Sequence, residues 1–273
     1  MIQTRFVKVA ALAITTACGE SSMPVRSASS SVAPEVAFVD VTPAQWEALA
    51  AKRILFGHQS VGGNILEGIE ELGGQPAGVT IQEIAESDSV RGPGILHAKI
   101  GVNGDHSSKL QAFRKLAGSE AADIAMMKFC YLDVTGSDPA EALFGAYRTE
   151  MEALRASRPG VRIVHATMPL TDNGNWKERL VKAIKRRPSA RELNVIRSRY
   201  NNLLRQEYAG REPLLDIARM ESTRTDGSRT AFGSGADTGY YLAPEFTDDG
   251  GHLNAVGRRA VAQQFLALLA TLD

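Results

Sequence analysis

This chain of 273 residues has few cysteines and no net charge. There are two cysteines, and the 31 basic side chains are matched by 31 acidic ones. A formal net charge of zero argues against a general nucleic-acid-binding protein, because such proteins depend on a surplus of lysine and arginine. Four of the five histidines are scattered without the short spacings of a zinc site, so we predict no metal; they are His58, His97, His106 and His165.

The apolar run at the N-terminus is too short to span a membrane. It covers residues 9–14, follows two basic residues and precedes Ala-Cys-Gly at 17–19, which is the pattern of a secretory signal peptide. We therefore expect an exported chain with a signal peptide at 1–18. A cysteine after a small residue resembles a bacterial lipoprotein cleavage site, where Cys18 would be lipidated. Thr15 stands where such sites usually carry an aliphatic residue, so plain secretory cleavage and an unprocessed terminus stay open.

The segment after this signal is rich in serine and poor in charge. Residues 19–40 have a composition that cannot build a core, and we expect them to form a flexible tether. Residues 41–273 suit a single medium-sized domain. Cys130 lies in an apolar run, where a buried core thiol is a more ordinary role than a redox or nucleophilic one. No intramolecular disulfide is expected if Cys18 is acylated.

Short apolar runs alternate with longer amphipathic segments along the domain. Such alternation predicts an α/β fold with a mainly parallel sheet covered on both faces, whose ligands bind at the carboxyl ends of the strands. The five strands are expected at 54–56, 79–84, 124–129, 161–166 and 214–217. The helices are expected at 43–52, 61–72, 107–116, 139–156, 190–208 and 254–272.

The tetrapeptide Gly-His-Gln-Ser at 57–60 lies between the first strand and a helix. A serine there would have the free N–H groups and partial positive charge of the first helical turn beside it, which favour an oxyanion. Ser60 is therefore a candidate nucleophile, although an ordinary helix N-cap would use the same residue type. His58 either flanks the pocket or only caps this turn.

A serine nucleophile needs a general base, and the base needs a partner that fixes its tautomer. The C-terminal part of the chain reads Asp249-Gly250-Gly251-His252, directly before the last helix. Its glycines allow Asp249 and His252 to approach each other. By itself the spacing is also compatible with an ordinary surface histidine.

These blocks together make the chain resemble the SGNH/GDSL hydrolase superfamily. The family has its base in an Asp-x-x-His block before the last helix, and 249–252 fits it. A middle block, commonly Gly-x-Ser-Gly-Asp-Thr-Ser, is matched closely by Gly-Val-Asn-Gly-Asp-His-Ser at 101–107. The resemblance implies a flavodoxin-like three-layer α/β/α sandwich with Ser60 as nucleophile, His252 as general base and acid, and Asp249 as its orienting partner. It also implies an oxyanion hole formed by the backbone N–H groups of Ser60 and Gly104.

Two blocks depart from the family pattern. The family's Gly-Asp-Ser is replaced by Gly-His-Gln-Ser at 57–60, and its Gly-x-Asn-Asp is replaced after Phe129 by Cys-Tyr-Leu-Asp at 130–133, which lacks the asparagine. Loss of one oxyanion donor can cost about 3 to 4 kcal/mol in the transition state. Asn103 is our substitute donor, with Tyr131 and Asn64 behind it. The departures mark a divergent subgroup of the family.

Two other motif interpretations fail on specific residues. Residues 57–62 have the glycine spacing of a phosphate-binding P-loop, but Gly63 and Asn64 stand where lysine and serine or threonine are needed. The α/β-hydrolase turn requires Gly-x-Ser-x-Gly, and His58 occupies its first glycine position. We therefore expect neither a nucleotide site nor that fold, and no cofactor.

Two further segments could contribute to a substrate site: a basic stretch that follows the fourth predicted strand and a long loop that precedes the Asp-x-x-His block. The basic stretch at 177–199 is ordinarily a solvated helix face, and the functional hypothesis is that it borders the substrate cleft and favours anionic polymers or lipid headgroups. The long loop containing 221–223, 233–235 and 240–241 is either packed loop structure or a lid.

The sequence thus predicts an exported bacterial envelope hydrolase that cleaves a carboxylic ester through an acyl-enzyme. The substrate class expected from location and family resemblance is an O-acylated envelope carbohydrate or a lipid ester, with an anionic substrate also open. We expect no nucleic-acid partner and membrane contact only through a lipid anchor at Cys18. The alternative is a catalytically weak or inactive envelope lipoprotein that binds a glycan or a protein.

Overall fold

The computed structural model describes residues 40–73, 78–84, 92–119, 122–136, 139–234 and 238–272. The predicted signal peptide with Cys18, and the predicted tether up to residue 39, lie outside these residues. The helices are α1 (Pro43–Ala50), α2 (Ser60–Glu71), α3 (His106–Ser119), α4 (Ala140–Ser157), α5 (Trp176–Ile184), α6 (Ala190–Tyr208), α7 (Ile217–Ser222) and α8 (Ala255–Ala270). The strands are β1 (Arg53–His58), β2 (Ile81–Glu83), β3 (Gly94–Lys99), β4 (Ile124–Met127), β5 (Arg162–Ala166), β6 (Leu214–Leu215), β7 (Ala231–Phe232) and β8 (Gly239–Tyr240).

The central sheet confirms the predicted fold class. Its strands pair in the order β2-β3-β1-β4-β5-β6, and every pairing is parallel. Without the edge strand β2, this is the 2-1-3-4-5 order of flavodoxin-like sheets. The sheet has six strands where five were predicted. The missed strand, β3, directly follows the Gly/Pro-rich stretch that suggested a connection, and it is buried next to β1.

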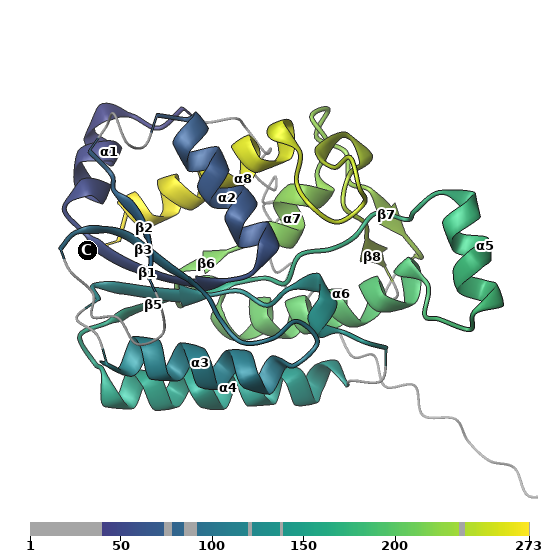
Figure 1. The fold of residues 1–273 in the computed structure, drawn as a ribbon, viewed down its shortest axis with the longest axis horizontal. Helices are drawn as coiled ribbons and strands as arrows, with labels where there is room; N and C mark the ends of the chain where they lie inside the picture. Colours follow the sequence, from purple (N-terminus) through teal and green to yellow (C-terminus); the bar gives the residue numbers. More distant parts are fainter. Residues whose placement is uncertain are drawn as a thin grey trace, which may run out of the picture. The chain divides into compact units, whose positions relative to one another are not determined.

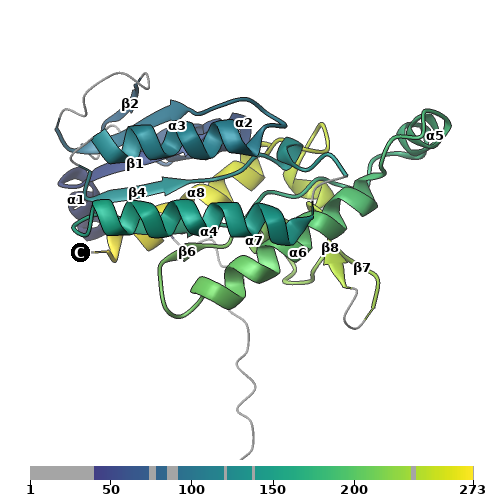
Figure 2. The ribbon, with the colours of Figure 1, turned by 90° about the horizontal axis from the view of Figure 1, so that it is seen from below.

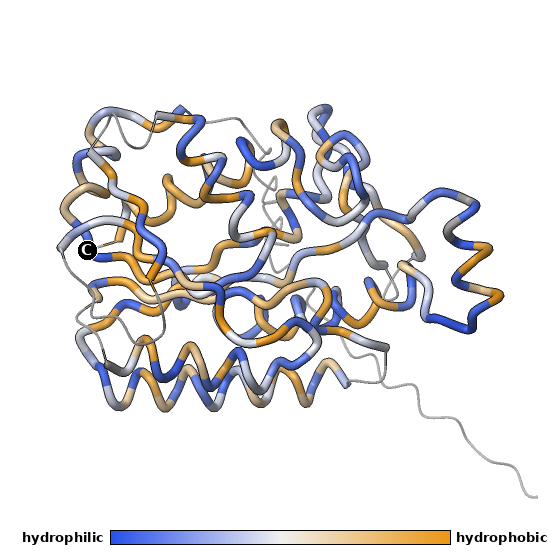
Figure 3. The backbone as a smooth tube through the Cα atoms, viewed as in Figure 1, coloured by the Kyte–Doolittle hydropathy of each residue, from blue (hydrophilic) through white to orange (hydrophobic). Residues whose placement is uncertain are grey.

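Helices cover both faces of the sheet, as Figures 1 and 2 show: α1, α2, α7 and α8 lie on one face and α3, α4 and α6 on the other. Side chains of β1 alternate between the two cores, with Ile54 and Phe56 in the first and Leu55 in the second. All three are fully buried. The inner strands β1, β3, β4 and β5 are accordingly mostly apolar (Figure 3), as expected of a parallel sheet buried on both sides.

Three elements were not predicted. The basic segment begins with a separate helix, α5, and the long loop after β6 contains α7 and the two-stranded β7–β8 hairpin. α7 and the two hairpin strands are short and carry too few periodic apolar positions to stand out. α5 has apolar residues at helical spacing, at 180, 181 and 184, but its many charged residues led to its interpretation as part of a basic segment. Among the helices of the described residues, none is long and apolar enough to cross a membrane.

The strand order reverses between β1 and β4. In a doubly wound sheet this switch point opens a crevice at the carboxyl ends of the two strands, where ligands bind. The segment after β1 begins with Gln59 and Ser60, and the segment after β4 leads into a 3₁₀ turn at Tyr131–Asp133. Chain topology thus places both segments at one edge of the sheet.

Candidate active site

Ser60 is the first residue of α2, and its residue surface is exposed. The N-cap position belongs to Gln59, whose side chain makes no capping bond. The ordinary capping role considered for Ser60 is therefore not the one it has here. Its backbone N–H belongs to the first helical turn, where N–H groups lack an intrahelical acceptor. Within the described part of the chain, Ser60 Oγ makes no hydrogen bond, so the hydroxyl is open to solvent and substrate.

The two residues before Ser60 hold this turn in place. Gln59 Nε2 donates to the carbonyl oxygens of Ile100 and Gly101, at 2.7 and 3.0 Å, and so ties the turn to the loop after β3. His58 Nδ1 is 2.7 Å from the Gln59 carbonyl oxygen, which can only accept, so this nitrogen carries the proton. His58 Nε2 then accepts from Nδ1 of His97 at 3.0 Å.

His58 is buried behind the turn, with 1% of its surface exposed. Burial lowers its pKa to about 3, and the neighbouring Lys128 adds to that shift although the hydrogen bond to Gln59 opposes it. His58 is therefore neutral and supports the turn instead of facing the crevice. A Cβ atom on Gly62 would lie 2.3 Å from His58 Cβ. Glycine is therefore required at position 62, four residues after His58, for the imidazole to pack behind the turn.

Asp249 and His252 meet as predicted. His252 Nδ1 lies 2.6 Å from Asp249 Oδ2, and Asp249 Oδ1 accepts from the backbone N–H groups of Gly251 and His252 at 2.9 and 2.8 Å. Burial favours the protonated acid, but these hydrogen bonds from His252 and Gly251 outweigh it and lower the pKa of Asp249. The carboxylate stays ionised and fixes the proton of the imidazole on Nδ1, which leaves Nε2 as the acceptor.

The Asp-His turn is also tied to the helix that carries Ser60. Asn64 Oδ1 accepts from the backbone N–H of Leu253 at 3.1 Å. Asn64 lies four residues after Ser60 on α2, about 6 Å along the helix axis, so this bond attaches the residue that follows His252 to the helix that begins with the candidate nucleophile. No hydrogen bond joins Ser60 Oγ to His252 among the described residues, and such bonds are often loose without substrate.

Tyr131 covers the other side of His252. The two rings meet edge to face with centroids 5.9 Å apart, and a Cβ atom on Gly251 would lie 2.8 Å from Tyr131 Oη. Glycine is therefore required at 251 for the ring to lie against this turn. Burial, with help from the charge of Asp249, raises the pKa of Tyr131 to about 12. Its hydroxyl stays protonated and able to donate.

The loop after β3 differs from what its motif predicted. Gly104 has a φ of 87°, and its N–H donates to Asp133 Oδ1 at 3.0 Å. Asn103 Oδ1 accepts from Lys109 Nζ at 2.8 Å. The N–H of Gly104 thus belongs to a network that leads inward, and any part that Gly104 plays in an oxyanion hole requires this N–H to be released or shared. Asn103 joins the network only through its oxygen, and its amide N–H groups take no part in the bond to Lys109.

This network is centred on a buried ion pair that sequence reasoning missed. Lys109 Nζ donates to both oxygens of Asp133 at 2.7 Å, and neither side chain has any exposed surface. Asp133 Oδ2 also accepts from the N–H of Cys130 at 2.7 Å. Cys130 is a free, buried thiol, as predicted. Nothing in the sequence marked Lys109 as different from the other lysines of an amphipathic helix.

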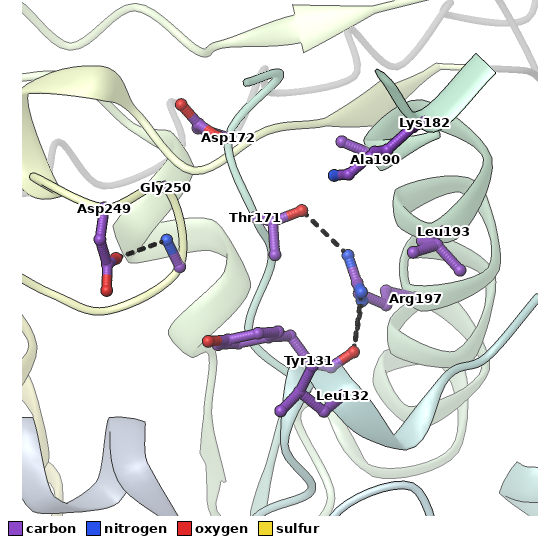
Figure 4. A pocket seen from close by; sticks show the side chains of 11 residues that line it. Tyr131, Leu132, Thr171, Asp172, Lys182, Ala190, Leu193, Arg197, Asp249 and Gly250 are labelled. Atoms are coloured by element: carbon purple, nitrogen blue, oxygen red, sulfur yellow. Dashed lines mark hydrogen bonds between the residues drawn. The ribbon is translucent and has the colours of Figure 1, made fainter. Parts of the chain in front are cut away.

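Arg197 is a second buried charge at this edge of the sheet. Its Nε and Nη2 donate to the carbonyl oxygen of Tyr131 at 3.1 and 2.7 Å, and Nη1 donates to Thr171 Oγ1 at 3.1 Å (Figure 4). Nη1 also donates to Asn194 Oδ1 at 2.6 Å. Burial lowers its pKa to about 10. The basic segment was expected to be solvated or to border the cleft. Arg197 is not solvated, since it is only 2% exposed and holds Tyr131 in position, and both Arg197 and Lys182 line a pocket beside the Asp-His turn.

A pocket of ≈ 230 Å³ lies beside the Asp-His turn. Figure 4 shows Tyr131 and Arg197 on one side of it and Asp249 and Gly250 on another, with Lys182 contributed from α5. Its lining comprises Tyr131, Leu132, Thr171, Asp172, Lys182, Ala190, Leu193, Arg197, Asp249, Gly250 and Gly251. Ser60 and His252 do not line it, so it adjoins the candidate catalytic residues and is suited to the part of a substrate next to the reacting bond.

The first part of the long loop before the Asp-His turn is packed, and residue 235 of the predicted segment 233–235 lies outside the described residues. Glu221, Ser222 and Thr223 are buried, and Glu221 accepts a hydrogen bond from the N–H of Leu170. Burial raises the pKa of Glu221 to about 8. These residues support the loop interpretation over the lid. No group of three histidine, cysteine, aspartate or glutamate residues in the described ranges could hold a metal ion.

Comparisons with known proteins identify similar solved structures. No family model and no curated protein matches the chain. A candidate acylhydrolase from Bacteroides fragilis is 16% identical, with a TM-score of 0.49 over 81% of this chain and 88% of its own. A GDSL-like lipase from Bacteroides thetaiotaomicron is 15% identical (TM-score 0.46, 84% and 96%), and a member of the lipolytic G-D-S-L family from Veillonella parvula is 11% identical (0.47, 80% and 98%). Function is therefore inferred from the residues of the site itself.

Proposed function

We propose that this protein is a serine esterase with Ser60, His252 and Asp249 as its catalytic triad. The observation that carries the proposal is the Asp-His turn: Asp249 binds His252 Nδ1 at 2.6 Å, and the next residue is bonded to Asn64 on the helix that begins with Ser60. This arrangement gives the nucleophile, base and orienting acid their required roles.

The chemistry follows from the tautomer of His252. Ser60 Oγ attacks the ester carbonyl carbon while Nε2 of His252 takes the hydroxyl proton. The same nitrogen then gives that proton to the departing alkoxide, which leaves an acyl group on Ser60. A water molecule, deprotonated by His252, attacks the acyl-enzyme and releases the carboxylic acid. Asp249 stays ionised and stabilises the imidazolium in both halves of the reaction.

The oxyanion is assigned to two donors. One is the N–H of Ser60 in the first turn of α2, where the helix dipole adds to the stabilisation. The other is the hydroxyl of Tyr131, which is protonated and next to His252. The N–H of Gly104 would be a third donor only after leaving Asp133. Tyr131 thus takes the place of the asparagine that the family resemblance leads one to expect.

The substrate class we propose is an ester of the bacterial envelope, either an O-acylated carbohydrate or a lipid. Its support is the expected export signal and lipidation site at Cys18, together with the resemblance of the motifs. The polar pocket beside Asp249 contains hydroxyl, carboxylate and ammonium groups from Thr171, Asp172 and Lys182. Such a lining suits a hydroxylated group on the leaving side of the ester.

A non-catalytic glycan- or protein-binding protein is the second candidate. It is favoured by the loop after β3, where the N–H of Gly104, the predicted oxyanion donor, is bonded to Asp133 instead.

A fluorophosphonate probe with intact-mass detection separates the two candidates. We expect one adduct on the wild-type protein and none on Ser60→Ala, and a matched Ser107→Ala change on the exposed face of α3 should leave labelling unchanged. Hydrolysis of short-chain aryl esters should fall at least about a thousandfold in Ser60→Ala. A folded wild-type protein that takes no label and hydrolyses no ester would establish the binding protein instead.

A further inference from the structure

Helix α5 projects away from the rest of the described domain. Figures 1 and 2, which differ by a quarter turn, both show it at the end of an extended connection, outside the layers that cover the sheet. It runs from Trp176 to Ile184 and is followed by a short turn into α6. Helices in water bury their apolar side, so an isolated helix with such a side has a surface left to cover.

Three apolar side chains of α5 are exposed on one side. Leu180, Val181 and Ile184 are 53%, 48% and 73% exposed, and Figure 3 shows the apolar colour on this projecting segment. Residues three and four apart share a helix face, so Ile184 lies beside both of the others. Over the described residues, only four other large apolar side chains are comparably exposed, and they belong to separate elements; they are Val102, Leu132, Val195 and Val256.

The remaining faces of α5 are strongly basic. Residues 177–187 contain six lysines and arginines and one glutamate, in a chain whose total charge is zero. Successive residues are about 100° apart on a helix, which puts Arg179 and Lys182 opposite the apolar face and Lys177 at the N-terminal end of that face. Lys185, Arg186 and Arg187 follow the last residue of α5. A depression of ≈ 400 Å³ is lined by Lys177, Val181, Lys182, Lys185 and Arg187 together with Asn175.

We propose that α5 binds the surface of an anionic lipid bilayer, with Leu180, Val181 and Ile184 inserted among the acyl chains and the basic residues at the headgroups. This combination of a basic face and a short apolar face is that of helices that lie in the membrane interface. An anionic glycan would match the charge but leave the apolar face exposed. A second copy of this chain would bring one basic helix against another.

The bilayer contact would also orient the candidate active site. Lys182 of α5 lines the pocket that Asp249, Gly250 and Gly251 line from the other side. Because Lys182 lies opposite the apolar face, a bound α5 would hold this pocket next to the bilayer, on the side of the helix that faces away from the acyl chains. The inference does not depend on catalysis, since it rests on the exposure and charge of α5 alone. It departs from our expectation that the membrane is contacted only through a lipid anchor.

Tryptophan fluorescence provides the test, because the chain has two tryptophans and one of them begins α5. In full-length Trp46→Phe protein, Trp176 is the only tryptophan. We expect its emission to shift to shorter wavelength on vesicles of phosphatidylcholine and phosphatidylglycerol in about a 2:1 ratio, and to be quenched by lipids brominated on their acyl chains. The matched Trp176→Phe protein, which retains only Trp46 of α1, should show neither effect.

Two sets of changes separate the apolar and charged contributions. The triple change Leu180→Ser, Val181→Ser and Ile184→Ser should abolish quenching, whereas Val195→Ser on α6 should not. The double change Lys185→Glu and Arg187→Glu should weaken partitioning at least about tenfold on anionic vesicles. Reversing Lys115 and Arg148, which are on α3 and α4, is the charge control and should have no such effect.

The outcomes also separate this inference from the proposed esterase. Ser60→Ala should bind vesicles as the wild type does, even though it takes no fluorophosphonate. Equal quenching of Trp46 and Trp176, or partitioning that the α5 changes leave unaltered, would overturn the inference and place any lipid contact elsewhere in the chain. Binding of Trp176 to soluble anionic polysaccharide with no quenching by brominated lipid would overturn it in favour of a glycan.

Discussion

The turn that carries Asp249 and His252 and the loop that carries Asn103 and Gly104 were both predicted from motifs, but their polar groups point to different uses. In the Asp-His turn the two side chains bond to each other and remain partly exposed, at 56% and 41% of their side-chain surface. In the loop after β3 the polar groups are bonded to Asp133 and Lys109, which are fully buried.

The two segments differ in where their backbone N–H groups find hydrogen-bond acceptors. The Asp-His turn is complete in four residues, because the carboxylate of Asp249 accepts the N–H groups of Gly251 and His252 and the imidazole proton. The loop after β3 is satisfied only in part by nearby groups: the N–H of Asp105 bonds to the Val102 carbonyl and the N–H of Val102 to Ser108 Oγ. The N–H of Gly104 is bonded by Asp133 from a distant segment, where the carboxylate also binds Lys109.

The largest expected effect is on the turn. Asp249→Asn should lower kcat for an aryl ester about ten-thousandfold, because the amide cannot hold the Nδ1–H tautomer of His252. KM should change little, since Asp249 does not bind the reacting carbonyl. Steady-state kinetics on Asp249→Asn and on the neighbouring control Asp248→Asn would measure this. Equal rates for the two variants would show that the Asp249–His252 pair is structural only.

The next largest effect should be a loss of stability when the buried ion pair that holds the loop after β3 is broken. Lys109→Met leaves Asp133 as an uncompensated buried charge and should reduce the free energy of unfolding by about 3 to 5 kcal/mol. Urea unfolding followed by circular dichroism would measure it, with the exposed Lys115→Met of the same helix as control. A loss as small as that of the control would mean that the buried pair contributes little to the loop.

Tyr131→Phe tests which segment supplies the oxyanion donor. If the hydroxyl of Tyr131 serves, kcat should fall about a hundredfold with little change in KM or in the free energy of unfolding. The control is Tyr240→Phe in the β7–β8 hairpin. An unaltered kcat would return the role to the loop, and the N–H of Gly104 would then have to leave Asp133 during the reaction.

The smallest expected effect is a change in how stability depends on pH, and it comes from His58, which is buried behind the turn of Ser60. The pKa of His58 is lowered from 6.5 to about 3, chiefly by burial. The unfolded chain therefore binds a proton between these values that the folded chain does not, so stability falls as pH falls through this window, by about 1.4 kcal/mol per pH unit. His58→Gln, which retains a donor for the Gln59 carbonyl, should remove this one-proton slope. Urea unfolding at several pH values would reveal it, and identical slopes would contradict the burial of a neutral His58.

Much of the fold could be predicted because its strands are apolar runs buried on both faces. The strand around Ile54 and Phe56 is recognisable from three residues. β3 was missed because the glycines and proline before it suggested a connection, whereas Gly94 ends that connection and starts the strand. Its φ is 129°, and a Cβ atom at this position would lie 2.0 Å from Thr80 Oγ1, which explains why only glycine fits there.

In the candidate site, too, some features could be predicted from the sequence and others could not. Pairing of Asp249 with His252 needs only four residues and two glycines, so the sequence by itself determined it, as it determined the strand-to-helix turn at Ser60. The buried Lys109–Asp133 pair, the separate buried Arg197 and the isolation of α5 were decided by tertiary structure alone. A lysine or arginine in an amphipathic segment looks the same whether it is solvated or buried, because its environment is set by distant parts of the chain.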